Sequence, residues 1–462
     1  MTHMYKLNGY NIVLDAGSGA IHSVDKLAYD IIGMYADTPR GELVRLVLEK
    51  YASRPDITEQ EILDTLSDID ELKAAGKLFS DDETGAEAAK ALGRRESAVR
   101  ALCLHVSHAC NMSCDYCFAG GGRYRGESAL MAYETGRQAI DFLIDSSGGA
   151  RVLDIDFFGG EPLLNWDVVK RLVAYCRRAE SSRGKLFRFT LTTNGVLLDD
   201  DVTDFCNREM HNVVLSLDGR PRVHDSRRKL GEKGSYDVIL PKFRRFVEAR
   251  GGRSYYIRGT FTHENTDFTR DVTHMADLGF TELAMEPVVA APGAPGALTW
   301  DDLPALCGQY ELLASEMLRR EREGRGFTFY HYTLDLPGGP CIYKRVSGCG
   351  SGFEYLAVTP EGELYPCHQF VGDTAYRMGD VWAGVTNASL RAAFRSCGVY
   401  SRPECRECWA RLYCSGGCAA NSYRATGSIE GVHEFGCRLF KKRLECAVMM
   451  AVARSADAYG DA

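Results

Sequence analysis

The spacing of hydrophobic residues changes along the chain and divides it into three parts. In the first part, short apolar segments around a glycine-containing turn predict a β-hairpin, and apolar residues at helical spacing then predict three helices. The third helix begins with Thr-Glu-Gln-Glu, which is typical of a capping box. A hairpin with three helices indicates a small winged-helix domain. The predicted strands are 5–7, 10–14 and 20–24, and the predicted helices are 26–35, 40–51 and 58–75.

In the second part, apolar strands alternate with helical segments, which predicts a parallel α/β sheet, either open or barrel-like. There are six such units, fewer than the eight of a complete barrel, so the predicted fold is a partial (β/α)6 TIM-like barrel. Functional residues of such folds lie at the C-terminal ends of the strands. The predicted strands are 99–106, 152–158, 187–192, 213–217, 255–262 and 282–285, and the predicted helices include 132–144, 166–181 and 303–321.

The third part loses this alternation and is rich in glycine and cysteine. A segment of this size without a clear core pattern needs another source of stability, and metal clusters can provide it. The acidic, alanine-rich stretch Asp81–Leu92 is predicted to be a linker, and Arg454–Ala462 a frayed tail. The predicted domains are 1–92 including the linker, 93–330 for the barrel, 331–450 for the cysteine-rich domain, and a tail at 451–462.

Composition narrows the functional classes. With 45% hydrophobic and 26% charged residues, the 462-residue chain is typical of a soluble globular protein. No apolar run reaches the roughly 18 residues that cross a bilayer, since Ala447–Ala453 is too short. The N-terminal segment lacks a signal-peptide pattern, so we expect a cytoplasmic protein without a membrane partner. A net charge of −8 argues against a nucleic-acid partner.

Seventeen cysteines point to metal or redox chemistry, because thiols in the cytoplasm stay reduced. Cys110, Cys114 and Cys117 follow the first barrel strand with the spacing C-x3-C-x2-C. Three thiolates on one loop can bind three irons of a [4Fe–4S] cluster and leave the fourth iron open to an outside ligand. The alternatives are a zinc knuckle or buried cysteines. The nearest upstream cysteine, Cys103, lies within the predicted strand and is expected to point into the core.

This cysteine spacing, with an aromatic residue before the last cysteine, resembles the radical S-adenosylmethionine (SAM) superfamily. The resemblance implies that SAM chelates the open iron and is cleaved to a 5′-deoxyadenosyl radical. Further motifs follow in order at strand ends: Phe158-Gly159-Gly160-Glu161-Pro162, Thr192-Thr193-Asn194-Gly195 and Ser216-Leu217-Asp218-Gly219. Turn or capping chemistry is the alternative for these polar residues. The resemblance implies cofactor contacts by Tyr116, Phe118, Gly159, Gly160, Glu161, Asn194, Ser216 and Arg258, the last pairing with the SAM carboxylate.

The third part resembles the seven-cysteine SPASM extension, which holds two auxiliary [4Fe–4S] clusters. The resemblance therefore implies three [4Fe–4S] clusters in all. Zinc is the alternative, because C-x2-C with C-x3-C also resembles a zinc ribbon. Cys341 is a possible fourth ligand of auxiliary cluster I. The crossed SPASM pattern implies Cys349, Cys367 and Cys418 for auxiliary cluster I and Cys405, Cys408, Cys414 and Cys437 for auxiliary cluster II. The remaining cysteines, expected to be core thiols, are Cys103, Cys176, Cys206, Cys307, Cys397 and Cys446.

The first part resembles the PqqD-like domain of peptide-maturation enzymes, which implies that it binds the leader of a precursor peptide by strand addition. The whole chain is similar to the SCIFF (six cysteines in forty-five residues) maturases, which form thioether bonds in ranthipeptides. The strings KLNGYNIVLDAGSGAIHSVD and LAVTPEGELYPCHQFVG carry this resemblance. It implies a Cys-rich precursor peptide as substrate, a flavodoxin or ferredoxin as electron donor, and a radical thioether-forming reaction. It does not assign individual catalytic residues.

Two other functions remain open. An anaerobic sulfatase maturase has the same barrel and SPASM extension but oxidises one Cys or Ser to formylglycine, and other peptide cross-links are also compatible. The alternative from another class is a zinc- or cluster-bearing protein that binds DNA through its winged helix.

Overall fold

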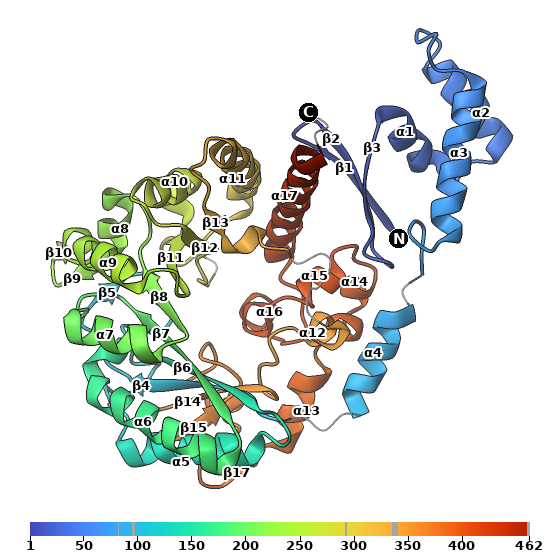
Figure 1. Ribbon diagram of the computed structural model, residues 1–462. Coiled ribbons are helices and arrows are strands. Elements are labelled where there is room, and N and C mark those ends of the chain that lie inside the picture. Colours follow the sequence, from blue (N-terminus) through green and yellow to red (C-terminus); the bar gives the residue numbers. More distant parts are fainter. Residues whose placement is uncertain (82, 95–97, 292, 335–340, 460–462) are drawn as a thin grey trace.

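The computed structural model describes residues 1–81, 83–94, 98–291, 293–334 and 341–459 (Figure 1). The N-terminal part has the predicted strands and helices. Three antiparallel strands form a small sheet in the order β1-β2-β3, so β3 has a neighbour on one side only. Asp25 and Thr58 cap the first and third helices through their side chains. The elements are β1 (Thr2–Leu7), β2 (Tyr10–Asp15), β3 (Ile21–Val24), α1 (Lys26–Tyr35), α2 (Arg40–Lys50) and α3 (Glu59–Ala74).

The stretch predicted to be a linker is instead a helix, α4 (Glu83–Arg94), with Asp82 outside the described residues. Alanine, glutamate, lysine and leucine make up most of it, and these are strong helix formers. Ala88 packs against Val346 of α12 (Ile342–Ser347), and Figure 1 shows the two helices side by side. The segment therefore connects the N-terminal part with the cysteine-rich part through a small apolar contact.

The central part is the predicted parallel sheet, with helices on its outer side (Figure 1). All six predicted strands are present, and their ends differ from prediction by two residues or fewer. The strands are β4 (Ala101–Ser107), β6 (Val152–Gly159), β7 (Leu186–Thr193), β8 (Asn212–Ser216), β11 (Tyr255–Phe261) and β12 (Glu282–Pro287). The helices are α5 (Tyr133–Ser146), α6 (Trp166–Arg183), α7 (Asp200–Glu209), α8 (Pro221–Arg227), α9 (Tyr236–Arg250), α10 (Thr269–Asp277) and α11 (Leu303–Arg322). Short elements are β5 (Ser113–Cys114), β9 (Arg228–Leu230), β10 (Lys233–Gly234), η1 (Pro162–Asn165), η2 (His263–Asn265) and η3 (Trp300–Asp302).

The cysteine-rich part continues this sheet, which its sequence pattern does not predict. β14 (Tyr355–Val358) pairs with β4 in parallel, and three further strands extend the sheet from there. A single sheet of 11 strands results, in the order β13-β12-β11-β8-β7-β6-β4-β14-β15-β16-β17. The added elements are β13 (Thr328–Phe329), η4 (Tyr330–Tyr332), β15 (Glu363–Tyr365), η5 (Thr374–Tyr376), β16 (Gly379–Asp380) and β17 (Gly384–Val385).

Short helices joined by turns follow in the cysteine-rich part, and a long helix is its last element. α17 (Glu434–Tyr459) packs on α11, and its apolar stretch Ala447–Ala453 lies within the main core. The predicted frayed tail is therefore helical as far as Tyr459, and 460–462 lie outside the described residues. The short helices are α13 (Ala388–Ser396), η6 (Val399–Ser401), α14 (Pro403–Arg406), α15 (Arg411–Cys414) and α16 (Ala419–Thr426).

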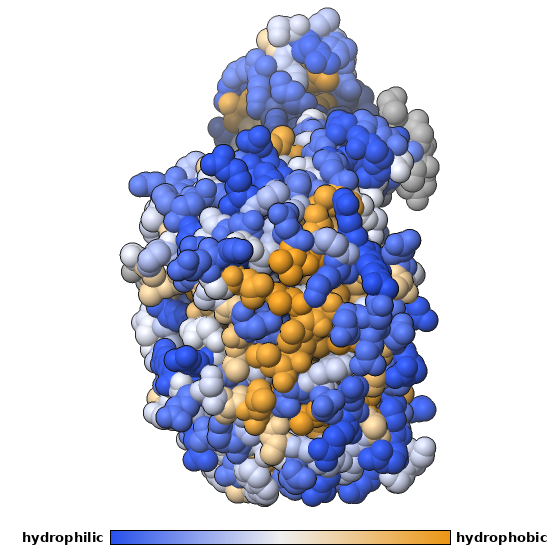
Figure 2. All heavy atoms as spheres, turned by 90° about the vertical axis from the view of Figure 1, so that its left-hand side faces the viewer, coloured by the Kyte–Doolittle hydropathy of each residue, from blue (hydrophilic) through white to orange (hydrophobic). Residues whose placement is uncertain are grey.

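The outer surface is mixed in polarity. Figure 2 views the molecule from the side on which α8 and α9 lie in Figure 1, and shows polar residues around a central apolar band. None of the described helices is both long and apolar enough to span a lipid bilayer.

Candidate iron–sulfur and cofactor site

Cys110, Cys114 and Cys117 lie on one loop that follows the C-terminal end of β4. The loop is held from outside by a two-stranded contact in which Cys114 of β5 stands opposite Arg228 of β9. Burial raises the pKa of the Cys114 thiol to about 12, with contributions from the neighbouring Cys117 and Cys110. Three free thiols thus lie close together, as the sequence predicts. Cys103 is buried in β4, in agreement with its predicted place in the core.

Gly159, the last residue of β6, and Gly160, which follows it, allow the start of the cysteine loop to pack closely against the end of this strand. A Cβ atom on Gly159 would lie 2.2 Å from the Ser107 carbonyl oxygen, and one on Gly160 equally close to the Ala109 oxygen. Gly159 also has a φ of 132°, which disfavours other residues. The Gly160 N–H donates to Ser107 O at 2.8 Å. In this structure, then, both glycines serve the start of the cysteine loop.

Glu161 is fully buried and its carboxylate is directed at the chain itself. It accepts hydrogen bonds from Thr193 Oγ1 at 2.8 Å, from the Asn194 N–H at 2.8 Å and from the Leu163 N–H at 3.1 Å. Burial raises its pKa to about 7, although these hydrogen bonds oppose the increase. Glu161 therefore ties together the ends of β6 and β7, and its predicted contact with the SAM amino group remains a prediction.

Asn194 follows the end of β7 and Ser216 ends β8, whereas Arg258 lies within the neighbouring strand β11. Asn194 Nδ2 donates to Asn111 Oδ1 at 2.8 Å and lies 3.7 Å from Cys110 Sγ, so it borders the cysteine loop. Ser216 and Arg258 are register partners on β8 and β11, so their side chains share one face of the sheet. Burial lowers the pKa of His368 to about 4, and the positive charge of the nearby Arg258 lowers it further.

The two aromatic residues of the loop have different surroundings. Tyr116 donates its hydroxyl to Asp218 Oδ2 at 2.5 Å. Phe118 is 37% exposed, and its ring centroid is 5.6 Å from that of His368. The geometry thus makes Tyr116 part of the protein framework and leaves a face of Phe118 accessible.

Sequence reasoning missed the residue that organises this side of the site. Asp218 is fully buried and accepts hydrogen bonds from Tyr116, from Arg228 Nε at 2.9 Å and from the Thr260 N–H at 3.0 Å. It therefore joins the cysteine loop to β11 and to β9. The only sign of this role in the sequence is that Asp218 lies in the motif Ser216–Gly219 at the end of a strand. A single aspartate at a strand end predicts only a turn, so the sequence does not reveal the role.

The cysteines of the third part separate into two groups, as the SPASM resemblance implies. Burial raises the pKa of Cys367, and the nearby thiols of Cys418 and Cys349 raise it further. Cys341 is exposed at the start of α12. The first group therefore consists of Cys349, Cys367 and Cys418, and the role of Cys341 as a fourth ligand remains a prediction.

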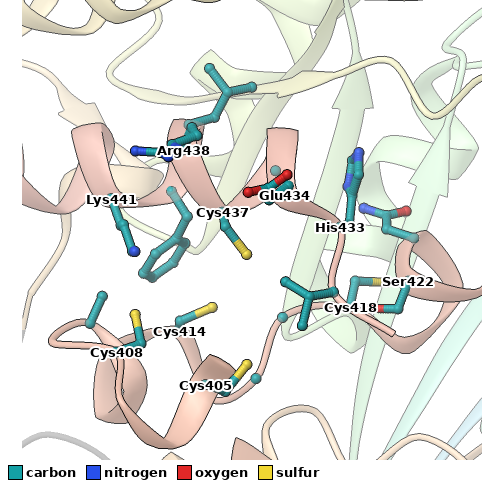
Figure 3. Close-up of a pocket in the computed structure, with 18 of the residues that line it drawn as sticks. Cys405, Cys408, Cys414, Cys418, Ser422, His433, Glu434, Cys437, Arg438 and Lys441 are labelled. Atoms are coloured by element: carbon teal, nitrogen blue, oxygen red, sulfur yellow. The ribbon is translucent and has the colours of Figure 1, made fainter. Parts of the chain in front are cut away.

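The second group contains four thiols from three helices and the turn between two of them. Burial raises the pKa of Cys414 to about 12, followed by contributions from its cysteine neighbours. Figure 3 shows the four sulfur atoms directed into a common space, with Cys418 of the first group to one side. This space belongs to a cavity of about 830 Å³ that reaches Glu286 at the end of β12. The four thiols are Cys405, Cys408, Cys414 and Cys437.

These donor sets fit iron–sulfur clusters. Sulfur-only sites of three or four thiols suit iron in such clusters, and the four-thiol site borders a cavity large enough for an inorganic core. Within the described ranges, no group of three or more His, Cys, Asp or Glu side chains is arranged for a single metal ion. Cys103, Cys176, Cys206 and Cys446 are buried, as predicted for core thiols, whereas Cys307 and Cys397 are only half-buried.

Comparison with known proteins agrees with this geometry. Residues 104–272 match the radical SAM superfamily, and residues 349–409 match SPASM, an iron–sulfur cluster-binding domain. The radical SAM cyclopropyl synthase TigE of Paramaledivibacter caminithermalis is 21% identical over 74% of this chain and 72% of its own length. A serine-type anaerobic sulfatase-maturating enzyme of Bacteroides thetaiotaomicron is 23% identical over 72% of this chain and 85% of its own length.

Among solved structures, Streptococcus suis SuiB bound to precursor peptide SuiA matches with a TM-score of 0.54 and 15% identity. The match covers 93% of this chain and 97% of that chain, so the overall fold extends across the N-terminal part as well. The chain therefore combines a radical SAM domain, matched over residues 104–272, with a SPASM iron–sulfur cluster-binding domain, matched over residues 349–409.

Proposed function

We propose that this enzyme installs thioether cross-links between cysteine thiols and acceptor residues of a ribosomally made precursor peptide, as the SCIFF maturases do. The observation that carries the proposal is the group formed by Cys349, Cys367 and Cys418, with Cys341 exposed at the start of α12. A three-thiol set leaves one iron of a [4Fe–4S] cluster open, and a soft iron site suits a substrate thiolate. Such a site favours a peptide substrate with a cysteine whose thiolate can bind the open iron.

The N-terminal part supplies the second element of the proposal. β3 is an edge strand, and the other edge of the same sheet, β1, contacts α17. An edge strand with unpaired backbone groups can accept an extended peptide as an additional strand. We assign β3 (Ile21–Val24) as the edge that binds the leader of the precursor.

The residues around the first cysteine loop position the cofactor. When bound there, SAM and its cluster supply a radical that abstracts hydrogen from carbon. Arg258 offers a guanidinium for the SAM carboxylate, and Ser216 lies beside it in register. Phe118 offers an exposed ring next to the loop. Glu161 and Asp218 keep the loop in place from two sides.

The proposal includes three [4Fe–4S] clusters, one for each cysteine group. Anaerobic reconstitution is expected to give about twelve irons and as many sulfides per chain, with about four lost in the Cys110/Cys114/Cys117 triple Ala variant. An electron donor such as flavodoxin or ferredoxin would supply the reducing electron. Zinc without iron in the reconstituted protein would contradict the cluster assignment.

Formylglycine formation is the second candidate, favoured by the 23% identity to a serine-type sulfatase-maturating enzyme over 72% of this chain. That reaction oxidises one side chain of the substrate and leaves an aldehyde. A thioether instead joins two residues and consumes a thiol. The two products therefore differ in reactivity, even where both have lost two hydrogen atoms.

Mass spectrometry of a Cys-rich precursor, incubated with enzyme, SAM and reductant, tests the proposal. The expected product has lost two hydrogen atoms per cross-link, and one cysteine per cross-link no longer reacts with iodoacetamide. A product that reacts with a hydrazide and keeps its other cysteines alkylatable would instead establish formylglycine formation. The triple Ala variant of the first cysteine loop is the control and should leave the peptide unchanged.

A further inference from the structure

Arg402 is a buried cation without a carboxylate partner in the part of the chain that the structure describes. Its exposure is 3%, and no described Asp or Glu lies within ion-pair distance of it. Its Nη2 donates to Ile429 O at 2.6 Å and contacts Cys397 Sγ at 3.1 Å, while Nη1 donates to Gly416 O. Neutral carbonyls and a thiol do not balance a buried charge, so an anion is expected nearby.

The guanidinium is also incompletely hydrogen-bonded. Its Nε is buried and has no partner among the described atoms. Buried donors in folded proteins almost always have an acceptor, so this N–H indicates a group that occupies the site in the working protein. The unpartnered Nε and the missing counter-charge are separate observations: the first calls for a buried hydrogen-bond acceptor, and the second calls for a negative charge.

The four-thiol group lies next to this cation. Arg402 precedes Cys405 by three residues, and its carbonyl partner Gly416 lies between Cys414 and Cys418. Arg402 is also the residue at the N-terminal cap of the short helix α14, which contains Cys405. Gly416 lines the same cavity as the four thiols. A four-thiolate iron–sulfur cluster is an anion with sulfur acceptors, which matches both requirements.

We propose that Arg402 is a positioning residue of the four-cysteine site, where its guanidinium donates toward cluster sulfur and raises the reduction potential of auxiliary cluster II. The proposal rests on the clusters of the proposed function. Positive charge and N–H donors near cluster sulfur favour the reduced, more negative state. By binding Gly416 O and Ile429 O, the same side chain also fixes the chain segments beside the ligands.

The first test compares full-length wild type with Arg402→Gln, Arg402→Lys and Arg406→Gln after anaerobic reconstitution. Arg406 is the matched control because it is exposed and ends the short helix α14, which Arg402 directly precedes. Iron content and an EPR-monitored redox titration are measured, and the signal lost in Cys437→Ala identifies auxiliary cluster II. The Arg402→Gln substitution is expected to lower the equilibrium constant for reduction of auxiliary cluster II at least tenfold. This corresponds to a decrease of about 59 mV in the reduction potential for one electron.

Arg402→Lys should retain part of the wild-type potential, because it keeps the charge but loses the fork of donors. Arg406→Gln should leave the potential unchanged. If the Arg402→Gln variant does not incorporate iron, the Arg402→Lys variant tests the proposal instead. An unchanged reduction potential of auxiliary cluster II in Arg402→Lys would then overturn it. Full iron content with an unchanged potential in Arg402→Gln would also overturn it. Wild type without any auxiliary signal would instead overturn the proposed function.

Discussion

The ring of His3 lies on the indole of Trp409, with centroids 3.7 Å apart and planes 5° from parallel. His3 belongs to β1 of the N-terminal sheet, and Trp409 directly follows Cys408 of the four-thiol group. His3 Nε2 also lies 3.0 Å from Glu445 Oε1 on α17. The proposed leader-binding part is therefore fixed directly on the scaffold of the four-cysteine site.

Replacing Trp409 with Ala is expected to loosen this attachment. The stacked pair contributes roughly 0.5–1.5 kcal/mol beyond the area that it buries. We expect a lower midpoint of thermal unfolding and faster proteolytic removal of the first 80 residues, with iron content unchanged. His3→Phe is the matched control, because it keeps an aromatic ring on Trp409 and loses only the Glu445 contact. Equal proteolysis of Trp409→Ala and wild type would contradict the role given to the stack.

Gly160→Ala is expected to disturb the first cysteine loop. The new Cβ would lie 2.2 Å from the Ala109 carbonyl oxygen, so the backbone that leads to Cys110 must move. Overpacking of this kind costs about 1–3 kcal/mol. Loss of about four irons and of SAM cleavage is the expected result, measured by iron analysis and by release of 5′-deoxyadenosine. Gly149→Ala is the control, since its Cβ would meet no atom within 4 Å.

The iron content of Cys→Ala variants distinguishes the proposed ligands of the auxiliary clusters from cysteines that do not bind a cluster. Cys437→Ala should remove about four irons, whereas Cys446→Ala, on the same helix, should retain all of them because Cys446 lies in the apolar core. Cys349→Ala should likewise disrupt auxiliary cluster I. Cys341→Ala should keep its full iron content if that cluster has an open iron. Iron loss from Cys341→Ala would show four protein ligands and remove the support for thiolate binding there.

The barrel could be predicted in detail, because each of its six strands is an apolar run and a recognisable motif follows each of the first four. The extension of the sheet by β14 to β17 could not, since strands of two to four residues have no periodicity to detect. The grouping of the cysteines could be predicted from their spacing, and the thiols of each group lie close together in the structure. Their role as cluster ligands stays a prediction. Asp218 and Arg402 were missed because their significance depends on burial and on partners that are distant in sequence.

Asp156 gives the stability of the barrel a specific dependence on pH. It lies half-buried on β6, and burial raises its pKa to about 6, with a contribution from Asp154 and an opposing hydrogen bond from Thr190. Because the pKa in the folded state exceeds the ordinary 3.8, the folded state binds the proton more tightly than the unfolded state. This stabilising contribution is complete below pH 3.8 and is lost as the pH rises through 6. Asp156→Asn should therefore stabilise the protein by up to about 2 kcal/mol above pH 7, allowing for solvent screening, and much less near pH 4.

Anaerobic thermal unfolding of wild type and Asp156→Asn between pH 4 and 8 measures this difference. The gap between the two midpoints should widen as the pH rises through 6 and level off above about pH 7, where Asp156 is almost fully ionised. Asp154→Asn is the control, since Asp154 forms an exposed ion pair with Arg188 and should lose a little stability at neutral pH. A gap that does not change with pH would mean that Asp156 is ionised throughout and that burial does not control its charge.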